Sequence, residues 1–187
     1  MNQGEPHVTH EEKVAALWDE KQVMKVILRF GRSLDTGNWP AYRSCFTNPL
    51  NIEFKSLTGQ EEVRVDADLW TLFAEQILSP VRRHHTYSNF DITLDGDRAH
   101  ALVYHTSRHW KSTDRGYSHN TQYGWYDFSL ERQADDQWLM SRVKHAFQWV
   151  DGNDALLDVH EPELGKTMLK VFCEANFAAA RATPVIG

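Results

Sequence analysis

The first third of the chain repeats apolar positions with the period of an α-helix. From residue 11 to about residue 34, apolar side chains recur at steps of three and four residues, which predicts one long amphipathic helix. Gly37 follows as a stop signal. A short second helical piece is expected over residues 39–46, followed by a strand at about residues 52–55.

A third helix is expected before Pro80. Thr58 and Glu61 have the Thr-x-x-Glu spacing of a capping box, which predicts that this helix begins there. Its apolar face is expected to carry Val65, Leu69, Leu72, Phe73 and Ile77.

The second half of the chain changes to the two-residue period of β-strands. Phe90, Ile92 and Leu94 alternate with polar residues and precede Asp95-Gly96-Asp97, which predicts a hairpin. Three long strands are expected over residues 99–110, 117–132 and 138–150, so the sheet should be mostly antiparallel. A last amphipathic helix is predicted over about residues 161–181.

Helices followed by a four-stranded meander predict an α+β fold. A strongly curved sheet would wrap around the N-terminal helices to bury its second face, which makes a cone-shaped α+β barrel with a pocket inside. The length of 187 residues suits one such domain. We expect the cone to span residues 1–152, and residues 153–187 to form a helical extension that packs on the cone or on a neighbouring subunit.

Composition and charge narrow the classes of partner. A net charge of −6 disfavours binding to a phosphate backbone, so no nucleic-acid partner is expected. No segment is apolar enough to span a bilayer, and Cys45 and Cys173 lie in no disulfide or zinc pattern, so we expect a cytoplasmic protein without a membrane partner. Ten His, seven Trp and six Tyr indicate an apolar pocket with polar tips.

Asp35 is the first candidate for chemistry. If the first helix continues through it, spacing from Met24, Leu28 and Gly31 places its carboxylate on the apolar face, where a buried acid needs a partner. Alternatively, Asp35 belongs to the C-terminal turn of the helix and faces water. The spacing is consistent with both.

Two adjacent histidines, His84 and His85, begin the strand that continues through Asn89. Strict alternation groups His84 with Phe90 and Ile92, and therefore predicts His84 as the core-facing imidazole. A bulge between His85 and Asn89 would reverse the assignment. An imidazole can accept a proton near neutral pH without much tuning.

The remaining motifs argue against a metal or a cofactor. His105 and His109 stand four residues apart on a strand, about 13 Å, which is too far to share one ion. The chain has no Gly-x-Ser-x-Gly elbow and no Gly-rich phosphate loop. We therefore expect neither a metal nor a cofactor.

Arg142 is a further candidate, on the last strand. It could pair with a carboxylate or hold an anionic leaving group, or it could be a charge on the solvated outer face. The many aromatic residues are core by default, although their density also suits a flat apolar ligand. The pocket residues expected among them are Trp39, Tyr42, Phe73, Tyr104 and Tyr126.

The motifs together resemble the SnoaL-like branch of the nuclear transport factor 2-like superfamily, which includes polyketide cyclases, scytalone dehydratase and a hexachlorocyclohexane dehydrochlorinase. The resemblance covers about residues 11–152. It rests on Leu34-Asp35-x-Gly-x-Trp39, His85-x-x-x-Asn89, Leu94-Asp95-Gly96-Asp97-x-Ala99, Gly124-x-Tyr126 followed by Arg132, Trp138-x-x-x-Arg142 and Trp149-x-x-Gly152.

The resemblance implies a cofactor-independent lyase or isomerase of dehydratase, dehydrohalogenase or cyclase type. It carries over an Asp35 and His85 dyad for proton abstraction from a small, apolar, ring-containing molecule, with Arg142 as an assisting cation. His84 remains the alternative base, because strand parity favours it. A non-enzymatic binding protein or a structural subunit of the same fold is the alternative function.

The sequence also leads us to expect that copies of the chain associate. A curved sheet rich in Trp and Tyr would expose a large apolar patch in a monomer, so we expect a homo-oligomer. The resemblance implies a trimer rather than a dimer.

Overall fold

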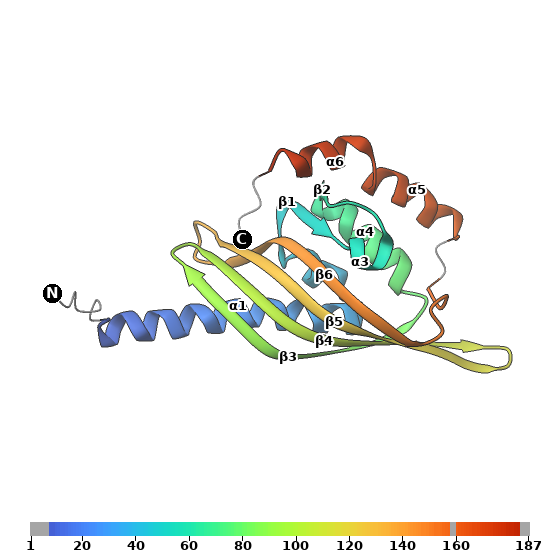
Figure 1. Ribbon diagram of the computed structural model, residues 1–187, viewed down its shortest axis with the longest axis horizontal. Coiled ribbons are helices and arrows are strands. Elements are labelled where there is room, and N and C mark those ends of the chain that lie inside the picture. Colours follow the sequence, from blue (N-terminus) through green and yellow to red (C-terminus); the bar gives the residue numbers. More distant parts are fainter. Residues whose placement is uncertain (1–7, 158–159, 184–187) are drawn as a thin grey trace.

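One mixed sheet and six helices make up the computed structural model, which describes residues 8–157 and 160–183 (Figure 1). The strands are β1 (Phe46–Glu53), β2 (Val63–Val65), β3 (Arg82–Asp95), β4 (Arg98–Thr113), β5 (Gly116–Arg132) and β6 (Trp138–Gly152). The helices are α1 (His10–Thr36), α2 (Trp39–Arg43), α3 (Lys55–Thr58), α4 (Ala67–Leu78), α5 (Pro162–Val171) and α6 (Glu174–Arg181).

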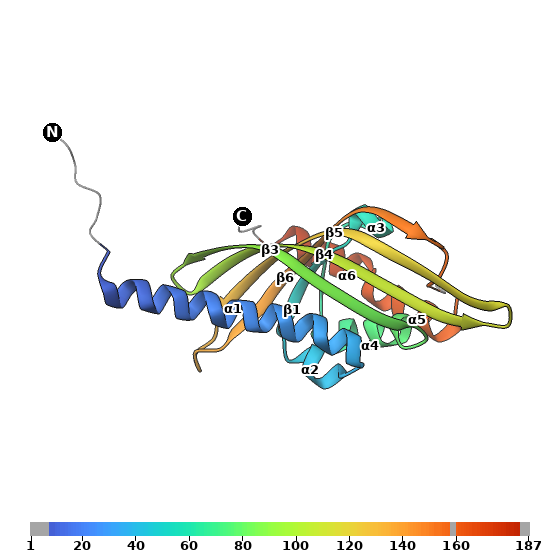
Figure 2. The same cartoon turned by 90° about the horizontal axis from the view of Figure 1, so that it is seen from below.

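The sheet has the strand order β2-β1-β6-β5-β4-β3. All neighbouring strands are antiparallel except β1 and β6, which are parallel. The sheet is open, with β2 and β3 at its edges, and it curves around α1, which contacts both β3 and β6 (Figures 1 and 2). The predicted α+β class with a curved, mostly antiparallel sheet is confirmed.

Helix α1 has well-defined ends. Thr9 and Glu12 form a capping box at its start, and Gly37 ends it in the left-handed conformation with φ +66°. Its C-terminal half is buried in the sheet, whereas its N-terminal part extends beyond the sheet in both views (Figures 1 and 2). The buried apolar side chains of α1 are Val23, Val26, Ile27, Phe30 and Leu34.

Aromatic packing makes Phe30 the centre of the core. Its ring lies 5.3 to 6.0 Å, between centroids, from Tyr42, Phe46, Tyr126 and Phe128. Because these rings come from α2, β1 and β5, this one α1 side chain ties the helices to both halves of the sheet.

Two predictions for the segment before α4 were wrong. Helix α2 ends at Arg43 and Phe46 already belongs to β1, so the strand lies earlier than expected. The capping box expected at Thr58 does not start a helix, because Asp66 caps α4 by accepting the N–H groups of Asp68 and Leu69.

The predicted C-terminal helix is two helices. The backbone leaves the helical region at Phe172 and Cys173, and the Asn176 side-chain amide donates to the carbonyls of Lys170 and Val171 at the break. Helix α5 packs on α4, with the rings of Phe172 and Phe73 5.9 Å apart, and α6 lies against β2 (Figure 1). None of the described helices is long and apolar enough to cross a membrane.

Gly31 marks a close approach that gives a stability prediction. A Cβ at this buried α1 position would collide with the Tyr87 ring of β3. Gly31→Ala should therefore lower the free energy of unfolding by about 1–3 kcal/mol. Gly165→Ala in α5 is the matched control: its Cβ would meet open space, so it should gain about 0.5–1 kcal/mol from helix propensity. Urea denaturation measures both, and equal changes of one sign would contradict the close approach.

Candidate functional site

Asp35 and His85 are in direct contact where the last turn of α1 meets β3. Asp35 Oδ1 lies 2.7 Å from Nδ1 of His85, and both carboxylate oxygens accept the backbone N–H of His85 at 3.1 Å. The His85 side chain is only 4% exposed and that of Asp35 is 23% exposed. Of the two readings of Asp35, the structure shows the one in which its carboxylate has a buried partner.

The contact determines which His85 nitrogen carries the proton. Burial raises the pKa of Asp35, but the hydrogen bonds from the His85 ring and backbone outweigh it, so the net pKa lies below its ordinary value. An ionised Asp35 only accepts, so Nδ1 of His85 must donate. In neutral His85 the lone pair is then on Nε2, which is the nitrogen available as a base.

His84 does not face the site, so the parity prediction was wrong. A register shift between Ser88 and Asp91 interrupts the pairing of β3 with β4, and Asn89 there adopts φ 51°. This irregularity reverses the alternation that had grouped His84 with the downstream apolar residues. His84 is exposed, whereas His85 turns toward α1.

A cavity of about 120 Å³ adjoins His85 on the inner face of the sheet. This volume is comparable to the roughly 150 Å³ cavity that holds benzene in an engineered protein, so it suits a single ring. Its walls are mostly apolar and come from α1, α2, α4 and the strands. The expected pocket residues Tyr42, Phe73 and Tyr126 line it.

Two of the expected pocket residues lie elsewhere. Tyr104 is 45% exposed and packs on Trp125, because its position on β4 alternates with the inward-facing Val103 and His105. Trp39 packs edge-on against Tyr42 and stacks with the Arg83 guanidinium, so it supports the cavity wall from behind.

Arg142 lies on the outer face of the sheet, so the expectation that it assists the dyad does not fit this structure. Strand β6 has an extra residue, Ser141, which reverses the alternation between Met140 and Arg142. The Arg142 guanidinium forms two hydrogen bonds with Glu62, at 2.9 and 3.0 Å. Burial raises the pKa of Glu62, but the Arg142 contact outweighs it, so the net pKa is lowered.

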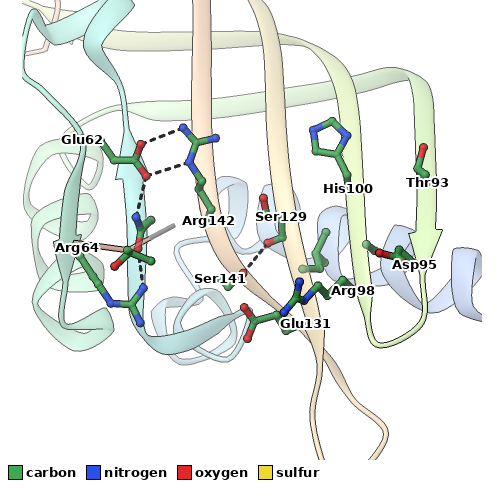
Figure 3. Close-up of a pocket in the computed structure, with 14 residues that line it drawn as sticks. Glu62, Arg64, Thr93, Asp95, Arg98, His100, Ser129, Glu131, Ser141 and Arg142 are labelled. Atoms are coloured by element: carbon green, nitrogen blue, oxygen red, sulfur yellow. Dashed lines mark hydrogen bonds and ion pairs between the residues drawn. The ribbon is translucent and has the colours of Figure 1, made fainter. Parts of the chain in front are cut away.

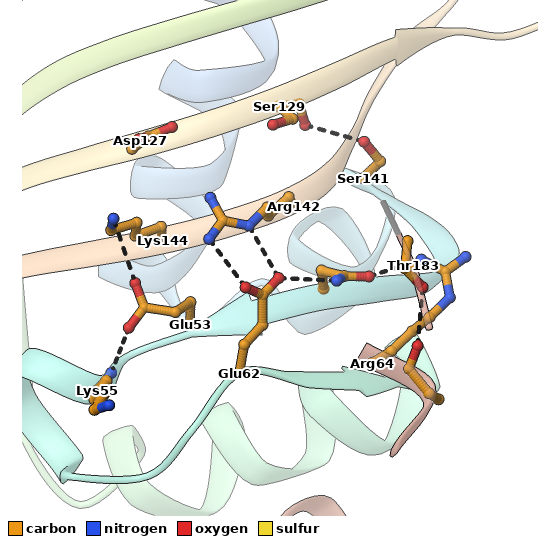
Figure 4. Close-up of polar contacts among 12 residues, drawn as sticks. Glu53, Lys55, Glu62, Arg64, Asp127, Ser129, Ser141, Arg142, Lys144 and Thr183 are labelled. Carbon is orange, nitrogen blue, oxygen red and sulfur yellow. Dashed lines mark hydrogen bonds and ion pairs between the residues drawn. The ribbon is translucent and has the colours of Figure 1, made fainter. Parts of the chain in front are cut away.

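These residues border a second, larger hollow on the outer face, of about 370 Å³ (Figure 3). Some of its lining groups are paired with one another, because Arg142 contacts Glu62 and Arg64 donates to Asn51. A Lys144–Glu53 ion pair lies outside the lining, next to Arg142 and Glu62 (Figure 4). This hollow also contains an imidazole–carboxylate contact, because His100 lines it and its Nε2 lies 2.7 Å from Asp127 Oδ1. The His100 side chain is 41% exposed, against 4% for His85, so this second pair faces solvent and the inner cavity is the site where an imidazole–carboxylate pair adjoins a mostly apolar space.

The structure also places polar residues at the inner cavity that the sequence analysis had not assigned to it. Ser107, His109, Gln122 and His145 line it. His109 Nδ1 lies 2.9 Å from Asn120 Oδ1, and the Asn120 amide donates to the carbonyl of Asn153. The alternation of His105, Ser107 and His109 on β4 is the signal that could have found them.

No group of three His, Cys, Asp or Glu side chains within residues 8–157 and 160–183 is arranged to hold a metal ion.

Comparison with known proteins identifies a family whose model matches most of the chain. Residues 15–144 match the model of the SnoaL-like domain. No curated protein matches the chain significantly in sequence. Among solved structures, the chain is similar to the Kfla4162 protein from Kribbella flavida, with 25% identity, a TM-score of 0.70 and coverage of 75% of this chain and 97% of that one.

Two more distant structures share the fold. One is a candidate scytalone dehydratase from Novosphingobium aromaticivorans, with 15% identity, a TM-score of 0.66 and coverage of 75% of this chain and 91% of that one. The other is hexachlorocyclohexane dehydrochlorinase LinA-type3 from Novosphingobium barchaimii, with 11% identity, a TM-score of 0.62 and coverage of 80% and 99%. At these identities the likeness establishes the fold alone.

The buried histidines predict acid sensitivity. Burial lowers the pKa of His105 to about 3, and those of His109 and His145 to about 4, from an ordinary 6.5. Below pH 6.5 the unfolded chain takes up protons that the folded chain does not, so stability is lost as pH falls from 6.5 toward 4. Each histidine contributes at most about 1.4 kcal/mol per pH unit.

Urea denaturation at pH 7, 6 and 5 measures this loss. His109→Phe should reduce the slope of unfolding free energy against pH by about a third, whereas His84→Ala, at an exposed position, serves as the control. Equal stability at pH 7 and pH 5 would contradict the neutral, buried state of these imidazoles.

Proposed function

The chain belongs to the SnoaL-like domain family, and from this premise we propose that it is a cofactor-independent lyase or isomerase acting on a small, largely apolar, ring-containing molecule. The observation that carries the proposal is the 2.7 Å contact between Asp35 and His85 beside a ring-sized cavity. A base held by an ionised carboxylate at an apolar pocket is suited to removing a proton from carbon.

In the proposed step, Nε2 of His85 takes a proton from a ring carbon. The C–H electron pair forms a double bond to the neighbouring carbon, and the leaving group departs with its own electron pair. Asp35 holds the ring in place and stabilises the imidazolium that forms. After an elimination the imidazolium gives its proton to the departing hydroxide, which leaves as water, or to solvent when a halide leaves. In an isomerisation no group leaves and the proton returns to another ring carbon, so in each case the protein ends unchanged.

The cavity wall offers a donor for developing negative charge. Burial raises the pKa of Tyr126, so its hydroxyl keeps its proton at neutral pH. A protonated hydroxyl at an apolar wall can donate to an oxygen or halide that gains charge in the transition state. This replaces the role that Arg142, on the outer face, does not serve.

Elimination is favoured among the possible reactions because two proteins with this fold are described as a dehydratase and a dehydrochlorinase. The alternative is a protein that binds a ring without transforming it. The two differ in one respect: the binding protein needs no proton transfer, so its ligand would remain chemically unchanged however tightly it binds.

Screening cyclic hydroxy-ketones and cyclic halides for release of water or halide tests the reaction. On a substrate so found, His85→Ala should lower kcat about 10²- to 10⁴-fold through loss of the base. Asp35→Asn should lower it as well, because an amide does not hold the proton on Nδ1. The double variant should be no worse than His85→Ala, since the two residues act as a unit.

His84→Ala is the matched control for this experiment, because it removes the exposed neighbour of His85 and should leave kcat unchanged. Full activity of Asp35→Asn would reject the dyad. Binding of rings with no product from any of them would favour the alternative function.

We further propose that the protein is a homo-oligomer, with a trimer preferred over a dimer. The outer face of the sheet carries two aromatic pairs: the Tyr104 ring packs at a tilt on Trp125, and the Tyr123 ring stacks on Trp149. Tyr104 is 45% and Trp149 58% exposed in the single chain. An apolar surface of this kind is typical of protein interfaces.

Light scattering should therefore give about three times the chain mass of 21.7 kDa at micromolar concentration. Trp149→Lys should shift the mass toward one chain, because it places a charge in the aromatic patch. Tyr117→Lys, at another exposed aromatic position near the β4–β5 turn, is the control. A mass near 21.7 kDa for the unaltered protein would refute the proposal.

A further inference from the structure

Two buried histidines at the cavity, His105 and the lining residue His145, are joined through their ring nitrogens. Nε2 of His105 on β4 lies 2.7 Å from Nε2 of His145 on β6. Their rings are 4.7 Å apart, and each also packs against Tyr126 of β5, which lies between their strands. On the other side, His105 Nδ1 lies 2.9 Å from the hydroxyl oxygen of Ser107.

This contact requires one shared proton. Burial lowers the pKa of both imidazoles, to about 3 for His105 and about 4 for His145, so both are neutral near pH 7. Two neutral imidazoles at hydrogen-bond distance must have one N–H and one lone pair between them. Either His105 donates to His145, or His145 donates to His105.

The remaining nitrogen of His145 distinguishes the two arrangements. His145 is 2% exposed, and its Nδ1 has no hydrogen-bond partner among the described residues. If His105 donated, neutral His145 would carry its proton on Nδ1, as a buried N–H with nothing to accept it. A buried donor without a partner is rarer in proteins than an under-used acceptor. The favoured arrangement therefore has His145 donating from Nε2.

The tautomer of His105 determines how the Ser107 hydroxyl at the cavity is hydrogen-bonded. When His105 accepts at Nε2, its proton is on Nδ1 and is donated to the Ser107 oxygen. The Ser107 hydroxyl proton is then not used by His105, and no other protein partner of this hydroxyl is found among the described residues. Ser107 lines the cavity and pairs in register with His85 across β3 and β4.

We propose that Ser107 is a ligand-binding hydrogen-bond donor, set in that role by His105 and His145, and that the ring bound in the cavity carries a carbonyl oxygen at Ser107, close to the C–H group that faces His85. This deepens the proposed function and rests on it for the identity of the reacting C–H group. His105 and His145 are positioning residues, because they act through Ser107.

A carbonyl suits this arrangement for two reasons. Its oxygen only accepts, so it matches a hydroxyl that is available to donate. When His85 removes a proton from the adjacent carbon, the C–H electrons move toward that oxygen, and a donor already in place stabilises the enolate that forms. The proton stays on His85, so the step balances without a co-reactant.

Ser107 is better suited to donate than to attack. A nucleophilic serine needs a base that takes its proton, and in the favoured arrangement His105 donates to Ser107 rather than accepting from it. Burial also makes both histidines weak bases near pH 7.

The first test reads the tautomers directly. In protein labelled with ¹⁵N in its histidine rings, NMR at pH 7 should show His105 protonated on Nδ1 and His145 protonated on Nε2, both neutral. The opposite tautomers, with protons on Nε2 of His105 and Nδ1 of His145, would overturn the proposal. This measurement needs no ligand and no substitution.

The second test compares two rings of the same shape, cyclohexanone and methylenecyclohexane, which differ in C=O against C=CH₂. Their dissociation constants are measured by NMR titration of the unaltered protein and of Ser107→Ala. The preference for the ketone, as the ratio of the two constants, should fall about 2- to 10-fold in Ser107→Ala, which is the loss of one neutral hydrogen bond.

Ser33→Ala is the matched control. Ser33 is 3% exposed and Ser107 2% exposed, and both changes remove one buried hydroxyl, but Ser33 does not line the cavity. The ketone preference should be unchanged in this variant. An unchanged preference in Ser107→Ala, or failure of both rings to bind the unaltered protein, would overturn the proposal.

These outcomes are separable from those of the proposed function, because tautomers and binding ratios are equilibrium properties without turnover. Loss of activity in His85→Ala, together with an unchanged ketone preference in Ser107→Ala, would support His85 as the base and reject Ser107 as the hydrogen-bond donor. A ketone preference that depends on Ser107 in a protein without eliminating activity would retain the binding site and reject the reaction.

Discussion

The junction between the end of α1 and the start of β3 is the contact on which the candidate site depends. Three contacts hold it together: Asp35 accepts from the His85 ring and backbone, the Arg83 side chain donates to the Leu34 carbonyl, and the Tyr87 ring packs over Gly31. Because β3 is an edge strand, these contacts also fix its distance from the helix. The junction thereby closes one side of the inner cavity while it positions the base.

The division of the inner face into one base and several neutral imidazoles follows from the partners of each ring. At the cavity, His85 contacts a carboxylate, whereas His109 faces an amide oxygen and His145 faces another imidazole. A carboxylate stabilises a positive ring, but an amide or a neutral imidazole does so far less, and burial then keeps the ring neutral. Histidines in one cavity are thus given different roles by their surroundings.

Periodicity predicted the long first helix, the hairpin at Gly96, the long strands and the α+β class, because one face of each is buried by a continuous apolar stripe. Periodicity could not predict which face of the sheet a side chain occupies once a bulge has interrupted the strand. The irregularity at Asn89 reverses the alternation, and so strand parity placed His84 on the wrong side. The extra residue at Ser141 decides the face of Arg142, which the residue pattern had left open and the family resemblance had assigned to the site. The start of α4 was missed because the sequence has two possible N-caps, Thr58 and Asp66, eight residues apart. Only Asp66 directly precedes the buried first turn of the helix, which contains Ala67 and Trp70.

Arg142 shows why a motif position must be read with its register. A guanidinium facing the inner cavity would stabilise negative charge but would also have to be desolvated in an apolar space. On the outer face the Arg142 side chain is also largely buried, but the Glu62 carboxylate compensates its charge there. With that cation outside, the hydroxyl groups of Ser107 and Tyr126 that line the inner cavity are neutral donors for an oxygen or halide, while the ionised Asp35 accepts from His85. Such a cavity discriminates by the position of a hydrogen bond rather than by the charge of the ligand, and it favours an uncharged ring over an anionic one.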